Sequence, residues 1–426
     1  MNNIKSNISG LYTLTIGERQ EMISKLVGLT PEELKMLRNF GYLSPIKMNT
    51  MIENVIASYQ LPLGIASNFK VNNKDYLIPM VIEEPSVVAA ASNAAKMARK
   101  LGGFTSEKVS SIMISQIQIT HLRNIKEAKD LILKNKSEIL KIANEQDPVL
   151  YKLNGGAKDI EIREINTSRG KMLILHLLVD VLDAMGANSV NTMSEAIAPY
   201  IEGICDSRIY LRIVSNLATH RKAKCKATFD SSILGGDDVV EGILDAYAFA
   251  EADPYRAATH NKGIMNGIIA LALATGNDTR ALEAGAHAYA SMSGKYSPLS
   301  KFDIDSNGNL VGELELPLAF GIIGGMTKIH PMARIALKIL GVKSAEELSQ
   351  VAVALGLAQN VAALRALVSE GIQKGHMALH ARNLAKLADA PDHLIQKVTN
   401  IMIKDKVFRL DYARDIVRRL LNGEKR

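Results

Sequence analysis

One lysine is of interest because its neighbours differ from those of a typical surface lysine. In "ATHNKGIMNG" (258–267), Lys262 lies among polar and small residues, directly before the apolar run "IIALALATG". An ammonium group near an apolar, glycine-lined surface can be desolvated, and it is then a strong electrophile for a developing oxyanion. Lys262 is therefore a candidate catalytic group, with an ordinary solvated lysine as the alternative.

Two carboxylates are further candidates. Glu84 precedes Pro85 at the start of a predicted helix, where an acidic residue also serves simply as a partner of the helix dipole. Asp278 in "ATGND" is a typical turn or cap residue. Neither position alone distinguishes catalysis from a local structural role.

Two histidines lie one helical turn apart in "GHMALH", as in a zinc-binding pair. The zinc-peptidase pattern requires Glu after the first histidine, however, and this chain has Met377 between His376 and His380. No dense cluster of Cys, His or Asp supplies a third ligand in the sequence. We expect no metal, and His376 remains a candidate proton donor, with a hydrogen-bonded helix histidine as the alternative.

The loop "DAMGANSVNTM" (183–193) joins a predicted strand to a predicted helix. Gly186 permits close backbone approach, and the helix N-terminus offers free N–H groups and the positive end of its dipole. These are the requirements of a pyrophosphate site, although an ordinary strand–helix turn has the same pattern. The stretch is not GxGxxG, so a standard Rossmann motif does not apply.

The elements around this loop predict a small α+β domain. "SIMISQIQI" is a predicted strand, "IKEAKDLILKNKSEILKIANEQD" an amphipathic helix, and "KDIEIREI" and "GKMLILHLLVD" are strands joined by "NTSRG". A helix in "NSVNTMSEAIAPYIEGIC" and a strand in "RIYLRIVSN" complete the order β-α-β-β-α-β. We expect this ferredoxin-like domain at 110–217.

The remaining chain is mostly helical in prediction. The first hundred residues are expected to be helical, with a capping box at Thr30 and Glu33. "KAKCKATF" is a predicted strand with a solvated basic face, and "KFDIDSNGNLVGELELPL" a hairpin turning at Asn307-Gly308. We expect a large helical domain from 1–109 and 218–375, the small domain inserted within it, and a helical C-terminal unit at 376–426.

The composition is typical of a globular protein, and the positive net charge favours an anionic partner. The 426 residues are 47% hydrophobic and 22% charged, with a net charge of +7 spread along the chain. A diffuse excess favours a local anion site over nucleic acid or a membrane surface. Two cysteines, no signal-peptide pattern in "MNNIKSNISG" and an apolar run "MLILHLLVDVL" too short to cross a membrane predict a cytoplasmic protein.

Taken together, six motifs in order closely resemble those of class II hydroxymethylglutaryl-CoA reductase. They are "MIENVIASYQLPLGIASNF", "EEPSVVAAAS", "DAMGANSVNTMSEA", "DPYRAATHNKGIMNG", "ATGND" and "GHMALHARN". The resemblance runs from about residue 12 to beyond residue 385. One departure is visible, because the family's usual "ENVIG" ends here in Ala57, in a segment of the family's dimer contact.

The resemblance implies an activity and a set of catalytic residues. The family reduces hydroxymethylglutaryl-CoA to mevalonate and coenzyme A with two hydrides, through mevaldyl-CoA and mevaldehyde. Carried onto matching positions, it implies Glu84, Lys262, Asp278 and His376 as the catalytic set. Lys262, held charged beside Asp278, would stabilise the alkoxide, His376 would protonate the departing thiolate, and a buried Glu84 would supply a proton to the aldehyde.

The same resemblance implies the binding residues. Arg256, with Ser86 and Asn266, would hold the substrate's free carboxylate, which a guanidinium binds through two hydrogen bonds. The dinucleotide contacts would come from Asp147, Asp183, Met185, Gly186, Asn188 and Asn216. Asp147 would favour NADH over NADPH, since a carboxylate accepts a hydrogen bond from a ribose 2′-hydroxyl and repels a 2′-phosphate. Two alternatives remain: the nearby Lys136 and Lys141 could tolerate a 2′-phosphate, and Asp147 could simply form a turn, as Asp-Pro pairs commonly do.

The resemblance also implies a homodimer or an oligomer of dimers, with the active site at the interface and a mobile C-terminal flap. Two other classes of protein are alternatives to a reductase. An RNA-binding βαββαβ protein needs stacking aromatic residues on its central strands, and "SIMISQIQI" and "GKMLILHLL" have none. A zinc hydrolase using His376 and His380 lacks further ligands.

Overall fold

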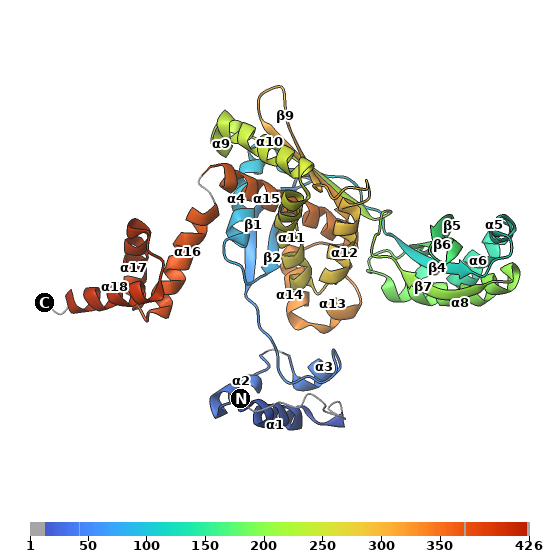
Figure 1. Ribbon diagram of the computed structural model, residues 1–426, viewed down its shortest axis with the longest axis horizontal. Helices are drawn as coiled ribbons and strands as arrows, with labels where there is room; N and C mark the ends of the chain where they lie inside the picture. The colour runs from blue at the N-terminus through green and yellow to red at the C-terminus, as the bar shows by residue number, and fades with distance from the viewer. Residues whose placement is uncertain (1–12, 42, 370–371, 424–426) are drawn as a thin grey trace.

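The computed structural model describes residues 13–41, 43–369 and 372–423, and at 26–27 and 372–379 it describes the backbone alone. Figure 1 shows a central body of sheet and helices, with a second sheet at one end and the C-terminal helices at the opposite end. Three separate clusters of buried apolar residues match these three parts. Residues 1–10, which have no signal-peptide pattern in the sequence, lie outside the described residues.

The central body is built on a six-stranded sheet. In spatial order its strands are β2 (Lys74–Val81), β1 (Leu63–Val71), β3 (Phe104–Ser106), β8 (Lys222–Phe229), β10 (Leu310–Pro317) and β9 (Ser300–Ile304). The β1–β3 pair is parallel and the other pairs are antiparallel. Alternate residues of β8 are buried, as its sequence predicts, because side chains alternate between the two faces of a strand.

Long helices pack against this sheet. They are α4 (Val87–Arg99), α10 (Asp237–Ala252), α11 (Pro254–Thr275), α12 (Thr279–Ala290), α14 (Pro331–Leu340) and α15 (Ala345–Val368), with short α9 (Ser231–Leu234) and α13 (Gly325–Ile329) between them. Among the described helices, only α15 is long and apolar enough to cross a membrane, and 67% of that stretch is buried against α4, α11 and the sheet. Its apolarity is thus that of a core helix.

The second sheet is formed within residues 112–214. Its spatial order is β5 (Gly156–Thr167), β6 (Gly170–Asp180), β4 (Ile112–Thr120) and β7 (Arg208–Val214), with every pair antiparallel. Four helices accompany it, namely α5 (Ile125–Lys134), α6 (Lys136–Asn144), α7 (Pro148–Lys152) and α8 (Ala187–Cys205). Strands and helices therefore follow one another in the predicted β-α-β-β-α-β order.

The ends of the chain form small helical units. The first holds α1 (Ile16–Val27), α2 (Pro31–Leu37) and α3 (Pro45–Asn49), and the last holds α16 (Ile372–Leu387), α17 (Asp392–Asp405) and α18 (Leu410–Gly423). Both predicted capping residues of α2 are in place, since Thr30 accepts from the Glu33 N–H and Glu33 accepts in return. In Figure 1 both units project from the central body.

Two secondary-structure predictions are wrong. The first hundred residues are not all helical, because β1 and β2 form a hairpin whose turn residues Asn72 and Asn73 have φ of 48° and 64°. Asparagine tolerates the left-handed conformation that such tight turns need. The single helix predicted after β4 is two helices that meet at Asn135. The Asn135 side chain donates to Leu131 O and accepts from Tyr200 Oη, and these bonds compete with a continuous helix.

Candidate active site

Helix α11 carries three of the predicted site residues. It begins where Asp253 accepts from the Arg256 N–H at 2.8 Å and Pro254 takes the first helical position, and it ends at Gly276 with φ of 71°. Lys262 and Asn266 are one turn apart and share a face, whereas Arg256 lies almost two turns before Lys262. The rigid helix fixes the spacing of these groups.

Lys262 and Glu84 are brought together by the fold. Lys262 Nζ donates to Glu84 Oε2 at 3.0 Å, and Glu84 lies in the short connection between β2 and α4. The expectation of a desolvated lysine is wrong for the single chain, since 59% of the Lys262 side chain and 34% of the Glu84 side chain are exposed. The apolar run after Lys262 enters the core, but the lysine itself lies at its edge.

Ser86 follows Glu84 by two residues in an uncommon backbone conformation. Its φ is 75°, and although it occupies the N-cap of α4, its side chain makes no capping hydrogen bond. Left-handed backbone at a residue other than glycine or asparagine costs free energy, and such strained residues cluster at functional sites. This strained turn directs the chain from Glu84 into the helix.

A buried histidine, His260, lies between Arg256 and Lys262 in α11. His260 Nε2 lies 2.6 Å from Ser300 Oγ, and Ser300 Oγ donates its one proton to Asn360 Oδ1 at 2.8 Å. Nε2 must therefore donate, which leaves Nδ1 as a buried acceptor without a hydrogen-bond partner. Burial and the nearby Arg256 charge lower the pKa of His260 to about 4, so the ring is neutral at physiological pH.

Asp278 lies at the other end of α11. It is the N-cap of α12, accepting from the Arg280 and Ala281 N–H groups, and it pairs with the Arg280 guanidinium at 3.1 Å. From Lys262 to the end of α11 at Thr275, the helical rise gives a separation of about 20 Å. The expectation that Asp278 lies beside Lys262 is therefore wrong within one chain.

The glycine loop before α8 has the geometry expected of a phosphate-binding turn. Gly186 is the N-cap with φ of 93°, and an added Cβ would lie 2.3 Å from Val181 Cγ1, so only glycine fits. No side chain caps α8, which leaves the N–H groups of its first turn for another acceptor. Met185 precedes this turn, and the exposed Asn188 lies within it.

Asp147 lies next to the same turn. Its Oδ1 accepts from the Leu150 N–H at 3.0 Å as the cap of α7, and its Oδ2 accepts from Ser189 Oγ, in the first turn of α8, at 3.0 Å. Asp147 thus caps a short helix and also contacts the first turn of α8. The loop of Asp147 is fixed against the helix that begins at Gly186.

Asp183 and Asn216 connect this loop to the central body. Asp183 Oδ1 accepts from the Ala345 N–H at 2.7 Å, so its carboxylate caps α15 rather than facing the glycine turn. The carbonyl of Asn216 lies so close to α12 that a Cβ on Gly285 would be 2.5 Å from it. Asn216 therefore packs against the middle of α12, the helix that Asp278 caps.

This chain is similar to known proteins over most of its length. The family model described as hydroxymethylglutaryl-coenzyme A reductase matches residues 15–381. The 3-hydroxy-3-methylglutaryl-coenzyme A reductase of Archaeoglobus fulgidus is 58% identical over 98% of this chain and 95% of its own length. The probable enzyme of Borreliella burgdorferi is 37% identical over 87% of this chain and 86% of its own.

The chain belongs to the hydroxymethylglutaryl-CoA reductase family. A solved structure of the class II enzyme from Streptococcus pneumoniae, bound to NADPH in open conformations, superposes with a TM-score of 0.76 at 40% identity. It covers 95% of this chain and 99% of the other. This likeness supports class II and the mixed α/β architecture of two sheets and many helices.

The fourth predicted catalytic residue is in the C-terminal helical unit. His376 belongs to α16, but its side chain lies outside the described residues, and His380 one turn later is exposed. Within the described side chains, no group of three or more His, Cys, Asp or Glu is arranged to hold a metal ion. The fold comparison favours a reductase over the zinc hydrolase and the RNA-binding protein.

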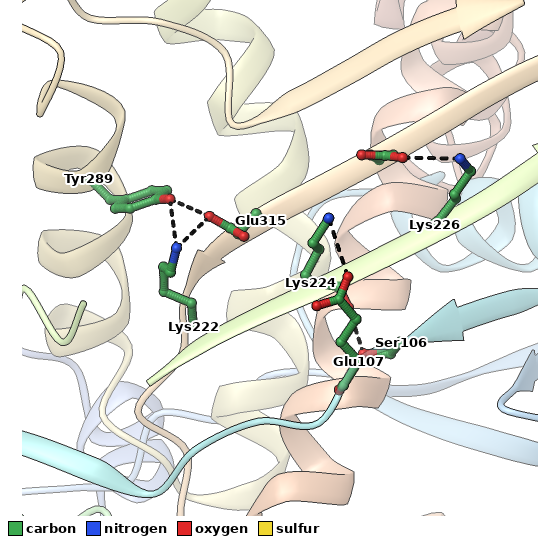
Figure 2. Close-up of polar contacts among 8 residues, drawn as sticks. Ser106, Glu107, Lys222, Lys224, Lys226, Tyr289 and Glu315 are labelled. Carbon is green, nitrogen blue, oxygen red and sulfur yellow. Dashed lines mark hydrogen bonds and ion pairs between the residues drawn. The ribbon is translucent and has the colours of Figure 1, made fainter. Parts of the chain in front are cut away.

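The basic strand β8 is balanced by acidic partners. Figure 2 shows Lys222 beside Glu315 and Tyr289, and Lys224 beside Glu107, with ion-pair distances of 2.8 and 3.2 Å. Lys226 pairs with Glu313 at 3.1 Å. Hydrogen bonding to Glu315 raises the pKa of Lys222, which stays charged, so this face is a set of ion pairs rather than a nucleic-acid track.

Sequence reasoning missed three residues at the loop end of the site. Arg221 is buried under the glycine loop, Gly321 packs against its backbone, and Asn277 Oδ1 accepts from the Gly321 N–H at 2.8 Å. The glycine-rich "GIIGG" (321–325) was visible in the sequence as a signal of close backbone approach. Arg221 carried no such signal, because it adjoins the lysines of a surface strand.

Proposed function

We propose that the chain is a hydroxymethylglutaryl-CoA reductase whose complete active site is assembled from two chains. The observation that carries this proposal is the separation along α11. The Lys262–Glu84 ion pair, at 3.0 Å, lies toward one end, and Asp278 with the glycine loop lies at the other, about 20 Å away. A second chain must supply what each end lacks.

The reaction is a four-electron reduction in two steps. Hydroxymethylglutaryl-CoA, two reduced nicotinamides and two protons give mevalonate, coenzyme A and two oxidised nicotinamides. In the first step a hydride adds to the thioester carbon, and the resulting mevaldyl-CoA breaks its C–S bond to give mevaldehyde and the coenzyme A thiolate. In the second step a hydride adds to the aldehyde carbon and the alkoxide takes a proton.

Lys262 is suited to the charge that develops in both steps. Each hydride addition turns a carbonyl oxygen into an alkoxide, and a fixed ammonium group stabilises that charge more strongly in the transition state than in the ground state. Glu84, hydrogen-bonded to Lys262 Nζ, is suited to deliver the proton to the alkoxide of mevalonate. Docking of a second chain over this exposed pair would remove water and strengthen both interactions.

We assign the protonation of the thiolate to His376. A histidine titrates near neutral pH, so it can give a proton to the departing sulfur and regain it from water. Helix α16 follows the C-terminal end of α15, and α15 packs beside α11 with Asn360 opposite His260. The flap of a chain therefore begins near that chain's own Lys262 end.

The free carboxylate of the substrate fits the residues around Lys262. Arg256 is half-buried on α11, and although burial lowers its pKa, the guanidinium stays charged and has two donors for a carboxylate. Ser86, which makes no capping bond, and Asn266, one turn from Lys262, add neutral donors. Binding here would place the thioester carbonyl toward the lysine.

The glycine loop fits a dinucleotide. A glycine forced by the Val181 contact and an uncapped N-terminus of a 19-residue helix are what a pyrophosphate needs. Met185, Gly186, Asn188 and Asn216 would line that site, and the bound nicotinamide supplies the hydride. Asp183 would hold the loop in place through its bond to the Ala345 N–H.

We further propose that NADH is the preferred reductant. Asp147 Oδ2 is anchored by Ser189 in the first turn of α8, so its charge lies close to where an adenosine ribose would follow the pyrophosphate. The two lysines able to offset a phosphate are already engaged, Lys136 with Asp159 at 2.5 Å and Lys141 with Glu138 at 3.3 Å. NADPH binding is a property of the Streptococcus pneumoniae relative.

We also propose a reducing, cytoplasmic setting. Both cysteines are free thiols, Cys225 buried and Cys205 half-buried. Burial raises the pKa of the Cys205 thiol to about 11, so it is unreactive at neutral pH. These thiols would stay reduced in the cytosol.

The test is a spectrophotometric assay of the full chain with hydroxymethylglutaryl-CoA and each reduced nicotinamide in turn. We expect two nicotinamides oxidised per mevalonate, and faster turnover with NADH. Sedimentation of the same sample should show a dimer, and specific activity should fall on dilution below its dissociation constant. Full specific activity in a monomer would contradict the two-chain site.

A further inference from the structure

We propose that Arg221 is a positioning residue that locks the cofactor loop to the start of α12, and so sets the distance between the bound nicotinamide cofactor and Asp278. This inference rests on the proposed function, because it takes the glycine loop as the cofactor site. Arg221 touches neither substrate nor reacting atoms, and acts through backbone that does.

Arg221 is almost completely buried, with 1% of its surface exposed. Its Nη1 donates to the carbonyl oxygens of Ala184 and Met185, at 3.1 and 3.4 Å, and its Nη2 donates to the carbonyl of Phe320. Two chain segments far apart in sequence, 184–185 and 320, are thereby joined by one guanidinium. Gly186 follows directly after the two bonded carbonyls of the first segment.

The buried charge is what makes this link specific. No direct ion pair of Arg221 is present among the described residues, and burial lowers its pKa to about 10, partly offset by Asp180 and Asp183. The group is still charged at neutral pH, so the carbonyl dipoles receive charged hydrogen bonds, which are stronger than neutral ones. A planar fork reaches three carbonyls at once, which an ammonium on a shorter stem does not.

A second set of contacts carries the position of the loop to Asp278. The Ile322 N–H donates to Asp183 O at 2.9 Å, and Ala184 forms a parallel bridge with Ile323. A Cβ on Gly321 would lie 2.5 Å from Met185 N, so the two backbones are in direct contact. Gly321 then donates its N–H to Asn277 Oδ1, one residue before Asp278.

The strand that follows Arg221 fixes the other side of this assembly. Lys222, the first residue of β8, points to the opposite face and meets Glu315 of β10 and Tyr289 of α12 (Figure 2). Adjacent residues thus hold the glycine loop on one side and α12 on the other. Because β8 is an interior strand of the six-stranded sheet, Arg221 is anchored to a rigid support.

The first variant is Arg221→Lys, matched with Arg365→Lys. Arg365 is a half-buried arginine whose Nε donates to Leu234 O at 2.7 Å, near the far end of α15. A cavity of about 180 Å³, bordered by Arg221, Asp183 and Ser349, gives water access to the shorter ammonium, so this variant is expected to fold. The measured quantities are the Kd of NADH and NADPH without substrate, the KM of hydroxymethylglutaryl-CoA, kcat and Tm.

We expect Arg221→Lys to raise the Kd of both nicotinamides about tenfold, the size of one lost charged hydrogen bond, and to lower kcat at saturating cofactor. The KM of hydroxymethylglutaryl-CoA should stay unchanged, and Arg365→Lys should leave the cofactor Kd at the wild-type value. A lower Tm with wild-type cofactor Kd and kcat would make Arg221 merely structural and overturn the proposal.

A second variant reaches the same contact from the other side. Gly321→Ala places a methyl group against Met185 N and should also raise the cofactor Kd, while Gly203→Ala on exposed α8 surface, where nothing lies within 4 Å, should not. A wild-type Kd in Gly321→Ala would contradict the proposal. If the wild-type chain itself bound neither nicotinamide, the proposed function would be wrong. That outcome differs from a wild-type cofactor Kd in either variant, which would overturn only the role of Arg221.

Discussion

The two ends of α11 differ in what surrounds them. Toward the Lys262 end, Lys262 pairs with Glu84, the half-buried Arg256 is on the same helix, and 59% of the Lys262 side chain is exposed. At the Asp278 end, Asp278 is held by its own helix, next to a loop fixed by a buried arginine, a glycine contact and a helix cap. The first region has reactive groups without enclosure, and the second has a rigid platform.

A continuous helix cannot bring its own ends together. The two regions are about 20 Å apart along α11, and the antiparallel neighbour α15, about 36 Å long, holds them apart. We therefore propose that a second chain encloses Lys262, because two chains related by a twofold axis would complete both sites reciprocally. The comparison predicts which changes affect chemistry and which affect cofactor binding.

The largest effect is expected at Lys262. Lys262→Ala removes the cation that meets both alkoxides, so kcat should fall by roughly 10²–10³ or more, for hydroxymethylglutaryl-CoA and for free mevaldehyde alike. The cofactor Kd should change little, because the dinucleotide contacts proposed at the glycine loop do not include Lys262. Lys301→Ala, at an exposed lysine of β9, is the control. Retention of most activity would remove Lys262 from the mechanism.

His376→Gln should separate the two half-reactions. Only the first step expels a thiolate, so the overall reaction should slow by roughly 10²-fold while reduction of free mevaldehyde is much less affected. Steady-state rates with each substrate give the comparison, and His380→Gln, one turn later, serves as the matched variant. Equal losses in both assays would indicate a structural role for His376.

Asp147→Arg should change cofactor choice without changing the chemistry. A guanidinium at this position would pair with a 2′-phosphate, so the NADH-to-NADPH ratio of kcat/KM should narrow or reverse, by roughly tenfold. Asp147→Arg also removes the N-cap of α7. Asp147→Asn keeps a capping side chain and is therefore the control for this loss. A wild-type enzyme that favours NADPH, or an unaltered ratio in the variant, would exclude Asp147 as the selector.

The smallest effect is expected in the pH dependence of stability. The folded pKa of His260 is about 4, below its unfolded value of 6.5, so the unfolded chain binds more protons between these values. Stability is therefore lost as pH falls through this window, and between pH 7.5 and 5.5 the His260 contribution is about 1 kcal/mol. Denaturant melts should show this loss reduced in His260→Gln and retained in His380→Gln.

Local patterns predicted those elements whose signals lie within the element itself. Alternation identified β8, the Thr30–Glu33 pair identified the start of α2, and Asn307-Gly308 identified the β9–β10 hairpin. The β1–β2 hairpin was missed because Asn72-Asn73 is a weaker turn signal and the flanking helices dominated the pattern. Asn135 broke a helix through a contact with Tyr200, 65 residues away, which no local window contains.

The site was predicted as a set of residues but not as an arrangement. Motif order along the chain identified Glu84, Lys262 and Asp278, and the fold pairs the first two. The order of motifs along the chain does not give the distances between their residues. The predicted helix between Lys262 and Asp278 nevertheless indicates that the two side chains of one chain are too far apart for contact. Arg221 could not be predicted, since burial of one basic residue beside three surface lysines depends on the whole tertiary fold.

The most direct test of the two-chain site is complementation between two inactive variants. Lys262→Ala and Asp278→Ala are purified separately, mixed, dissociated and reassociated, and assayed for reduction of hydroxymethylglutaryl-CoA. If Lys262 and Asp278 of one site come from different chains, each mixed dimer contains one intact site, and activity should return to about one quarter of wild type. If both residues of a site came from the same chain, every site would lack one of them and the mixture would stay inactive, contradicting the account.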